Sequence, residues 1–236
     1  MDNTVKLHEC VILVGGQGTR LRSVVQDIPK PMAGINGKPF LEYLLSFLNA
    51  QGCKRVVLSV GYKYEVIEQY FGNQYLNLKI DYAVEKEPLG TGGGIKNSLS
   101  FITQNDFFLL NGDSFFDVNL SQLSEFHTFN KSLVTLSVKE MHHVDRYGTL
   151  SIEDGKIVSF NEKQPIEKGF INTGVYVVSK SVFEKAYIPQ EKFSFEKDIL
   201  EENVSKLPFY AFQSDGYFID IGIPEDYRKA QEDFKK

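Results

Sequence analysis

Residues 8–21 read His-Glu-Cys-Val-Ile-Leu-Val-Gly-Gly-Gln-Gly-Thr-Arg-Leu, an apolar run followed at once by glycines. An unbroken apolar run that ends in glycine is typical of a buried parallel strand leading into a loop. Glycines let the backbone turn tightly and bring N–H groups close to phosphate oxygens. Arg20 adds a permanent cation that can bind phosphate through two hydrogen bonds. The loop matches neither GxGxxG nor a Walker sequence, so the pattern alone also allows a glycine-rich turn with a solvated arginine.

Strands and helices alternate through the first half of the chain. Leu41, Leu44, Leu45 and Leu48 have the spacing of one helix face, and Gly52 closes that helix. The other elements predicted here are strands at 54–60, 78–84 and 106–110 and helices near 66–71 and 95–102. This alternation predicts an α/β fold: a Rossmann-like, doubly wound, mostly parallel mixed sheet flanked by helices.

The second half has a more antiparallel pattern. Asp154-Gly155 between two short apolar segments is a strong hairpin signal. The predicted strands are 133–138, 147–152, 156–160, 170–178, 209–212 and 217–221, with helices at 195–204 and from Pro224 onward. No linker or repeat interrupts the chain, so we predict one domain over 1–236 whose second half completes a pocket.

Composition excludes several classes of protein. The formal net charge of −5 argues against a nucleic-acid polymer as partner, because binding to many phosphates requires a basic excess. The polar N-terminus has no signal-peptide core, and no apolar run approaches the roughly 20 residues that span a bilayer, so we expect no membrane partner. Two cysteines without metal-ligand spacing predict neither a disulfide scaffold nor a zinc site and fit a cytoplasmic setting.

Two carboxylates and one lysine stand where they could act on phosphates. Asp113 follows the apolar strand 107–110, and Asp220 lies inside the apolar segment 218–221. A turn-forming role for Asp113 and a buried ion pair for Asp220 would each be an ordinary explanation of one residue. Together the two carboxylates suit Mg²⁺, which takes few carboxylates plus phosphate oxygens. Lys30 lies between Pro29 and Pro31, which hold the backbone rigid around its ammonium.

The chain resembles the sugar-1-phosphate nucleotidylyltransferases, also called NDP-sugar pyrophosphorylases, along almost its whole length. The motifs that carry this resemblance occur in family order: residues 13–21, 29–31, 87–93, 111–113, 160–163, 171–176 and 218–227. The resemblance implies a Rossmann-like α/β fold, a first half (1–115) for the nucleotide and a second half (116–236) for the sugar phosphate. It also implies Mg²⁺-dependent attack of a sugar 1-phosphate on a nucleoside triphosphate, which releases pyrophosphate.

The resemblance assigns roles residue by residue. It implies that four residues are catalytic: Arg20, Lys30, Asp113 and Asp220. Arg20 would bind the triphosphate, Lys30 would contact the α-phosphate, and the two aspartates would hold the metal. The nucleotide-binding set that it implies is Leu13, Gly15, Gly16, Gly18, Thr19, Arg20, Glu85, Pro88, Gly90, Thr91 and Asp113. The implied sugar-phosphate set is Gly148, Glu162, Lys163, Asn172 and Thr173. The sequence departs from the family pattern at Gln164, Phe218 and Ile223, which affects the sugar pocket and removes no charge needed for the reaction.

The sequence also bears on which base and which sugar the protein uses. Guanine presents two adjacent donors that a carboxylate such as Glu85 could accept, which favours GTP, although acidic residues in related loops also serve other bases. Residues 28–33, 35–41 and 192–196 most resemble the D-glycero-D-manno-heptose 1-phosphate guanylyltransferases, which make GDP-heptose for bacterial surface glycans. Enzymes for mannose 1-phosphate with GTP, or for N-acetylmuramate or glucose 1-phosphate with UTP, are the alternatives.

Two other classes of protein also bind nucleotide sugars, and the sequence fits each of them less well. A metal-dependent glycosyltransferase would normally carry a DxD-type acid pair, whereas Asp113 and Asp117 are four residues apart. A non-catalytic nucleotide-sugar sensor would be expected to lack Arg20, Lys30 or a metal carboxylate, and none is missing. The sequence leaves open a homo-oligomer and any feedback regulation.

Overall fold

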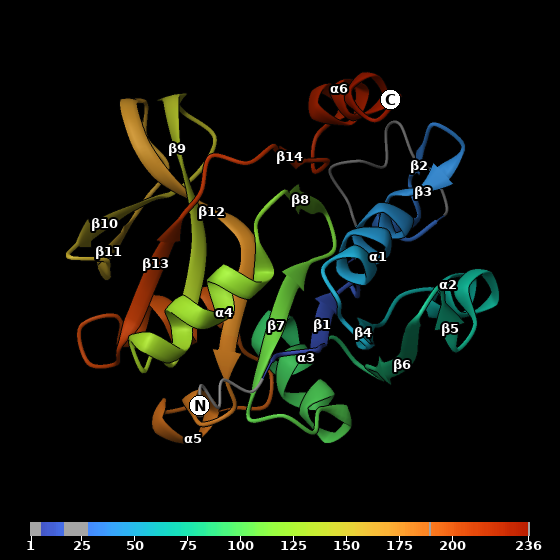
Figure 1. Ribbon diagram of the computed structural model, residues 1–236, viewed down its shortest axis with the longest axis horizontal. Helices are drawn as coiled ribbons and strands as arrows, with labels where there is room; N and C mark the ends of the chain where they lie inside the picture. Colours follow the sequence, from blue (N-terminus) through green and yellow to red (C-terminus); the bar gives the residue numbers. More distant parts are fainter. Residues whose placement is uncertain (1–5, 17–27, 189, 236) are drawn as a thin grey trace.

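A computed structural model describes residues 6–16, 28–188 and 190–235 (Figure 1). Its centre is a ten-stranded mixed sheet in the order β10-β11-β13-β9-β12-β7-β1-β4-β6-β5. Four neighbouring strands are parallel: β7 (Asp106–Asn111), β1 (Glu9–Leu13), β4 (Arg55–Val60) and β6 (Leu78–Val84). The short strand β5 (Gln74–Tyr75) pairs antiparallel with β6 at one edge. The α/β class and the mostly parallel first half predicted from sequence are confirmed.

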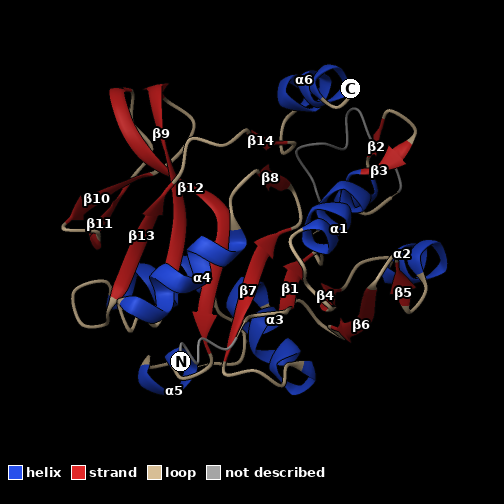
Figure 2. Ribbon diagram, in the orientation of Figure 1, coloured by secondary structure: helices blue, strands red, loops and turns tan. Residues whose placement is uncertain are grey.

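Two hydrophobic cores cover the two faces of this sheet. Alternate residues of a strand point to opposite faces, so Cys10 and Ile12 of β1 enter one core and Val11 enters the other. The first core is closed by α1 (Phe40–Ala50), α2 (Tyr64–Phe71), α4 (Leu120–Phe129) and α6 (Pro224–Asp233). The second is closed by α3 (Gly90–Ser98), α5 (Val182–Lys185) and η4 (Phe195–Glu201) (Figure 2). Helices therefore flank both faces, as a doubly wound fold requires.

The strands of the second half curl into a ring. β9 (Val134–Val144) and β12 (Ile166–Ser179) are the long strands, and β10 (Thr149–Glu153), β11 (Lys156–Asn161) and β13 (Phe209–Gln213) complete the set. β10 pairs with β12 as well as with β11, which closes the ring (Figure 1). The hairpin between β10 and β11 turns at Asp154 and Gly155, whose φ angles are 49° and 77°, as a tight two-residue turn demands.

The structure adds elements that the sequence pattern did not predict. They are the helices α4 and α5, the hairpin of β2 (Gly34–Ile35) and β3 (Lys38–Pro39), β5, and β8 (Ser114–Phe116). β8 pairs with β14 (Phe218–Asp220) in a separate two-stranded sheet. The C-terminal helix α6 is held on the β2–β3 hairpin by the Tyr227 hydroxyl, which donates to the Gly34 carbonyl at 2.7 Å. No helix among the described residues is long and apolar enough to cross a membrane.

Candidate active site

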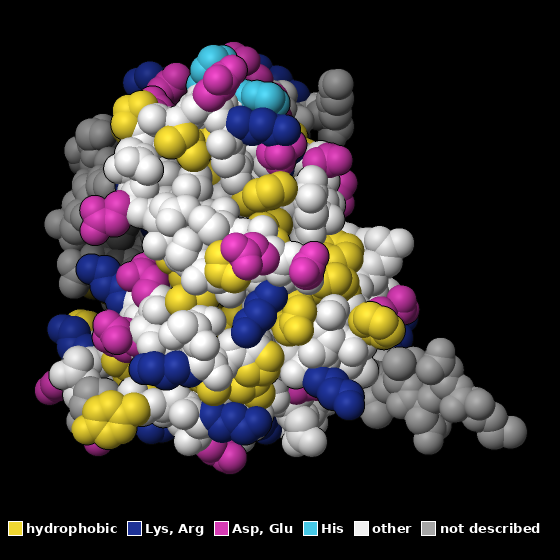
Figure 3. All heavy atoms as spheres, turned by 90° about the vertical axis from the view of Figure 1, so that its left-hand side faces the viewer, with side chains coloured by type: hydrophobic (Ala, Val, Ile, Leu, Met, Phe, Trp, Pro, Cys, Tyr) yellow, Lys and Arg dark blue, Asp and Glu magenta, His cyan; other side chains and the backbone are white. Residues whose placement is uncertain are grey.

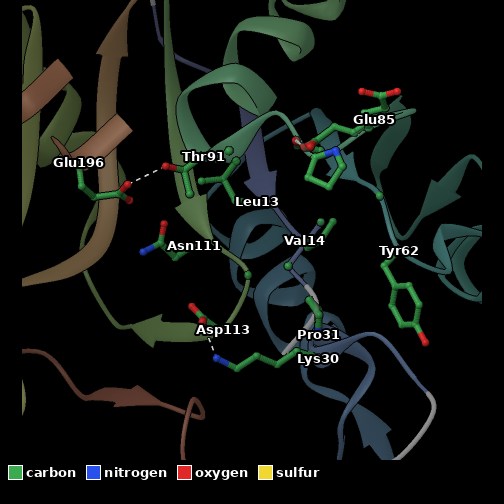
Figure 4. A pocket seen from close by; sticks show the side chains of 18 of the residues that line it. Leu13, Val14, Lys30, Pro31, Tyr62, Glu85, Thr91, Asn111, Asp113 and Glu196 are labelled. Carbon is green, nitrogen blue, oxygen red and sulfur yellow. Dashed lines mark hydrogen bonds and ion pairs between the residues drawn. The ribbon is translucent and has the colours of Figure 1, made fainter. Parts of the chain in front are cut away.

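A cavity of about 670 Å³ opens at the carboxyl ends of the four parallel strands (Figure 4). Within the sheet, β4 and β6 follow on one side of β1, and β7 lies on the other side of β1. This reversal of strand order leaves a crevice outside the strand ends, where open α/β sheets bind their ligands. The lining includes Leu13–Gly16, Lys30, Pro31, Ser59, Gly61, Tyr62, Glu85–Pro88, Gly90, Thr91, Asn111–Asp113 and Glu196. The size suits a small-molecule site.

Lys30 and Asp113 form an ion pair in this cavity. The Lys30 ammonium lies 2.5 Å from Asp113 Oδ2, and the two side chains are 10% and 37% exposed. Lys30 begins the short 3-10 helix η2 (Lys30–Met32), and the prolines on both sides fix its backbone. Asp113 follows β7, as the sequence predicted. The pair therefore places one cation and one carboxylate where phosphates would approach.

Asp220 is joined to the same place by backbone pairing. In the register of β14 against β8 it lies opposite Ser114, and the Ile221 N–H donates to the Asp113 carbonyl at 2.9 Å. The Asp220 Oδ1 atom accepts the Gly222 N–H at 2.6 Å. A Cβ atom placed on Gly222 would lie 2.7 Å from Asp220 Oδ1 and 3.1 Å from Lys30 Nζ. Asp113, Asp220 and Lys30 thus converge from three separate parts of the chain.

The carboxylates of Asp113 and Asp220 fit a magnesium ion that also binds phosphate oxygens of a substrate. Mg²⁺ is usually bound by one or two carboxylates together with phosphate oxygens and water, and Asp113 and Asp220 supply two carboxylates. Among the described residues no group of three or more potential metal-ligating side chains occurs.

The predicted nucleotide set falls into two parts. Leu13, Gly15, Gly16, Glu85, Pro88, Gly90, Thr91 and Asp113 all line the cavity. Gly18, Thr19 and Arg20 lie outside the described residues, so their predicted roles stay predictions. Glu85 follows β6 and accepts hydrogen bonds from Ser59 Oγ at 3.1 Å and from the Leu89 N–H at 3.0 Å. These bonds fix the carboxylate, and each of its oxygens retains a lone pair for a base donor.

The resemblance assigns residues 87–93 to a loop near the base and ribose, but the structure corrects this assignment, because helix α3 already begins at Gly90. A later segment packs so closely on this helix that side chains would not fit: a Cβ on Gly92 would lie 2.2 Å from the Phe193 ring, and one on Gly93 would lie 2.7 Å from the Glu191 carbonyl. The Gly92 N–H donates to the Phe193 carbonyl at 3.0 Å, and the Phe193 N–H donates to the Leu89 carbonyl at 3.0 Å.

Most of the predicted sugar-phosphate residues gather at one end of the strand ring. β10 pairs Thr149 with Asn161 of β11 and with Ile171 of β12. Continuing this antiparallel register by one residue places Gly148 beside Glu162 and Asn172. Glu162 and Lys163 are exposed, and neither is paired with another described residue. This group lies next to the cavity lining rather than within it.

Tyr147 connects this group to the two carboxylates. Burial first, and then the negative charges of Asp220 and Asp226, raise the pKa of Tyr147 to about 12. Its ring packs edge-on against Phe218, with the centroids 5.8 Å apart. Arg146, the neighbouring residue, pairs with Asp226 at the start of α6 at 3.2 Å.

Two of the predicted sugar contacts are engaged inside the protein. Thr173 is 1% exposed, and its hydroxyl donates to the Ser137 carbonyl at 2.9 Å, so the geometry does not support a contact from this side chain to a sugar. The Asn172 amide donates to the Tyr176 hydroxyl at 2.8 Å, and its oxygen accepts the Gly174 N–H at 3.0 Å. Asn172 therefore has less free hydrogen-bonding capacity than the sequence suggested.

Several cavity residues were absent from the predicted set, among them the polar side chains of Ser59, Tyr62, Asn111 and Glu196. Asn111 and Glu196 occur in motifs that carried the family resemblance, so their motifs were a usable signal. Ser59 and Tyr62 lie at and after the end of β4, and only the rule that parallel strand ends line the crevice could have identified them.

The fold and the cavity agree with a family match. Residues 9–236 match the Nucleotidyl transferase family, and the chain belongs to that family. It is 50% identical over 227 residues to a D-glycero-alpha-D-manno-heptose 1-phosphate guanylyltransferase from Aneurinibacillus thermoaerophilus, covering 96% of this chain and 98% of the relative. It is 51% identical over 220 residues to the enzyme of that name from Campylobacter jejuni, covering 93% and 96%.

A solved structure shares the same architecture. HddC from Yersinia pseudotuberculosis, crystallised in complex with GMP-PN, superposes with a TM-score of 0.86 at 44% sequence identity. The superposition covers 97% of this chain and 100% of the HddC chain. The nucleotide-diphospho-sugar transferase fold predicted from sequence is thereby confirmed.

Proposed function

We propose that this chain is a guanylyltransferase that transfers GMP from GTP to D-glycero-D-manno-heptose 1-phosphate, giving GDP-heptose and pyrophosphate. The observation that carries the proposal is the cavity at the strand ends, which Lys30 and Asp113 line and next to which the backbone after Asp220 is hydrogen-bonded to Asp113. Two relatives that are 50% and 51% identical to nearly the full chain support this choice of base and sugar. The product would serve the synthesis of bacterial surface polysaccharide.

The chemistry asked of these residues is an in-line displacement. A phosphate oxygen of the sugar 1-phosphate attacks the α-phosphorus of GTP, and the bond from that phosphorus to the β-phosphate oxygen breaks. The attacking oxygen is already ionised, so the protein must bring two anions together and neutralise their charge rather than remove a proton. The Lys30 ammonium is proposed to exchange its ion pair with Asp113 for a contact with the α-phosphate of GTP. The Arg20 side chain is proposed to stabilise the leaving pyrophosphate.

Asp113 and Asp220 are the residues proposed to hold Mg²⁺. The bound ion would supply neutralisation of the phosphate oxygens where charge develops. The two aspartates arrive on backbone-paired segments, so their separation is set by β8 and β14 rather than by flexible loops. This rigidity suits an ion that must bridge protein and substrate.

A pyrophosphate-release assay across a matrix of substrates tests the proposal. GTP, UTP, CTP, ATP and dTTP would each be combined with the 1-phosphates of heptose, mannose, glucose and N-acetylmuramate. We expect the highest kcat/KM for GTP with heptose 1-phosphate, loss of activity with EDTA, and recovery with added Mg²⁺. Absence of activity with GTP would refute the guanine assignment. A higher kcat/KM with mannose 1-phosphate would replace heptose by mannose in the assignment of the sugar substrate.

A further inference from the structure

One end of the cavity is lined by a group of polar side chains to which the proposed reaction assigns no role. Thr91 of α3, Asn111 at the end of β7 and Glu196 of η4 lie on one side, and Tyr62 and Glu85 lie on the opposite side (Figure 4). Lys30 and Asp113 lie between these two sides in the same view. If the base lies toward Glu85 and the phosphates at Lys30, the sugar must extend toward the end defined by Glu196.

The Glu196 carboxylate is held in one orientation by two hydroxyl groups. Its Oε2 atom accepts hydrogen bonds from Thr91 Oγ1 at 2.7 Å and from Ser194 Oγ at 3.1 Å. The Thr91 oxygen itself accepts the Phe195 N–H at 2.9 Å, which directs its own proton to Glu196. No hydrogen bond from another described residue reaches Oε1. A charged acceptor is therefore fixed at the cavity wall with one oxygen still available to a ligand.

Glu196 follows a segment that packs on α3, so its position depends on the tertiary fold. The Phe193 backbone makes hydrogen bonds to Leu89 and Gly92, and Glu196 lies in the first turn of the π-helix η4. Short π-helical stretches are frequent at functional sites, because their wider turn redirects side chains. The carboxylate is thus delivered to the cavity by a rigid contact rather than by a mobile surface side chain.

Tyr176 links this polar group to the predicted sugar residues. The ring is fully buried, and its hydroxyl accepts a hydrogen bond from the Asn172 amide at 2.8 Å. Burial first, and then the nearby negative charge of Glu196, raise the pKa of Tyr176, so it remains a neutral phenol. Asn111 lies against the same strand, because a Cβ placed on Gly174 of β12 would be 3.0 Å from Asn111 Nδ2. The Glu196 end of the cavity therefore adjoins the strand that carries Asn172, one of the predicted sugar residues.

We propose that Glu196, aided by Asn111, binds the exocyclic hydroxyls of the sugar 1-phosphate and selects a sugar whose carbon chain continues beyond C6. This inference rests on the proposed function, because it assigns a binding role within the same cavity. A heptose carries hydroxyls on both C6 and C7, whereas a hexose such as mannose has a single exocyclic hydroxyl on C6. The available Oε1 atom has two lone pairs, so it can accept a proton from each of two adjacent hydroxyls. A sugar lacking one of them leaves a desolvated charge underpaired, which is how polar sites reject shorter analogues.

The test compares two sugars in one variant. Glu196→Gln retains the size of the side chain and one acceptor oxygen for Thr91 and Ser194 but removes the charge. We expect kcat/KM for heptose 1-phosphate with GTP to fall about tenfold or more, kcat/KM for mannose 1-phosphate to change little, and KM for GTP to stay constant. An equal loss with both sugars, a raised KM for GTP or an unchanged selectivity would each overturn the inference.

A second variant and a matched control separate this role from folding. Thr91→Val removes the hydroxyl that orients Glu196 and should lower the heptose-to-mannose ratio in the same direction, so the inference remains testable if Glu196→Gln does not fold. Glu201→Gln neutralises an exposed glutamate of the same helix and should leave the ratio unchanged. If the wild-type protein lacks activity with GTP and heptose 1-phosphate, the proposed function fails. If the wild-type protein is active and only the selectivity is unaffected, the role of Glu196 fails alone.

Discussion

Carboxylates stand at both ends of the parallel strands, and their surroundings differ. At the amino end, Glu9 of β1 is 2% exposed, and both of its oxygens accept hydrogen bonds from Thr103, with a further bond from the Gln104 N–H. Arg55 of β4 approaches Glu9 at 3.5 Å and also pairs with Asp81 at 2.7 Å. The protein itself supplies hydrogen-bond donors to both oxygens of Glu9, so this buried charge stabilises the fold.

At the carboxyl end the acidic residues face open space. Asp113 has a side chain that is 37% exposed, and its partner Lys30 extends into the same cavity as Glu85 (Figure 4). A charge type alone therefore does not identify a site. What separates the two ends is whether the protein or a ligand must complete the hydrogen bonding, and the strand direction decides which end is open.

Neutralising a carboxylate at the open end should give the largest effect. Asp113→Asn retains the shape of the side chain and removes the charge proposed to hold Mg²⁺. We expect kcat to fall on the order of 10³-fold, because charge neutralisation by the metal is worth several kcal/mol in such reactions. Circular dichroism and thermal unfolding should remain close to wild type. A variant with near-normal turnover in Mg²⁺ would refute the metal assignment.

Neutralising a carboxylate at the closed end should do the reverse. Glu9→Gln loses hydrogen bonds to a charged acceptor, which costs about 2 kcal/mol and lowers Tm on the order of 5 °C at pH 7. Turnover at 25 °C should be unchanged, because Glu9 lies far along β1 from the cavity. Loss of activity without loss of stability would break the proposed division between the two ends.

The same comparison has a pH dependence. Burial alone would raise the pKa of Glu9, but the hydrogen bonds from Gln104 and Thr103 and the charge of Arg55 outweigh it and lower the pKa below its ordinary value of 4.5. Its stabilisation is therefore present above pH 4.5 and is lost as the pH falls through the lowered pKa of the folded state. The Tm difference between wild type and Glu9→Gln should shrink toward acid pH. A difference that stays constant would contradict this assignment.

The parallel part of the fold was predictable because its strands are buried on both faces. Such strands appear as unbroken apolar runs, and the prediction for β6 matched its observed bounds. The helix α4 was missed because its buried face contains His127 beside Leu120 and Leu123, so the apolar periodicity is weak. β8 has three residues, which is too short for a pattern to reveal, whereas β14 lies inside the strand predicted at 217–221.

The site was predictable where it depends on strand ends and not where it depends on packing between distant segments. Asp113 and Glu85 follow strands, so their position near the cavity could be inferred from sequence. The place of Glu196 depends on the contact of Phe193 with α3, which joins residues about a hundred positions apart. The internal bonding of Thr173 has the same origin, since only the structure shows its hydroxyl turned to Ser137.

A single methyl group at the open end should sharpen the role of Glu85. A Cβ on Gly94 would lie 2.6 Å from Glu85 Oε1 and 2.7 Å from Ser59 Oγ, so Gly94→Ala must displace the carboxylate. We expect kcat/KM for GTP to fall about tenfold, with little change in KM for the sugar phosphate. Gly34→Ala is the control, because a Cβ there meets no atom within 4 Å. An unchanged KM for every nucleotide would remove Glu85 from the base site.

A lysine beside the strand ring tests whether the site extends beyond the parallel strands. Lys163 follows β11 and is exposed, so its removal should cost little stability. If it holds the sugar phosphate, Lys163→Ala loses one charge-assisted contact, and KM for the sugar 1-phosphate should rise about tenfold while KM for GTP stays constant. Lys168→Ala removes another exposed lysine of the same ring, one already paired with Glu140 at 2.9 Å, and should change neither constant. Equal behaviour of the two variants would confine the site to the parallel strand ends, because the ring would then contribute no binding charge.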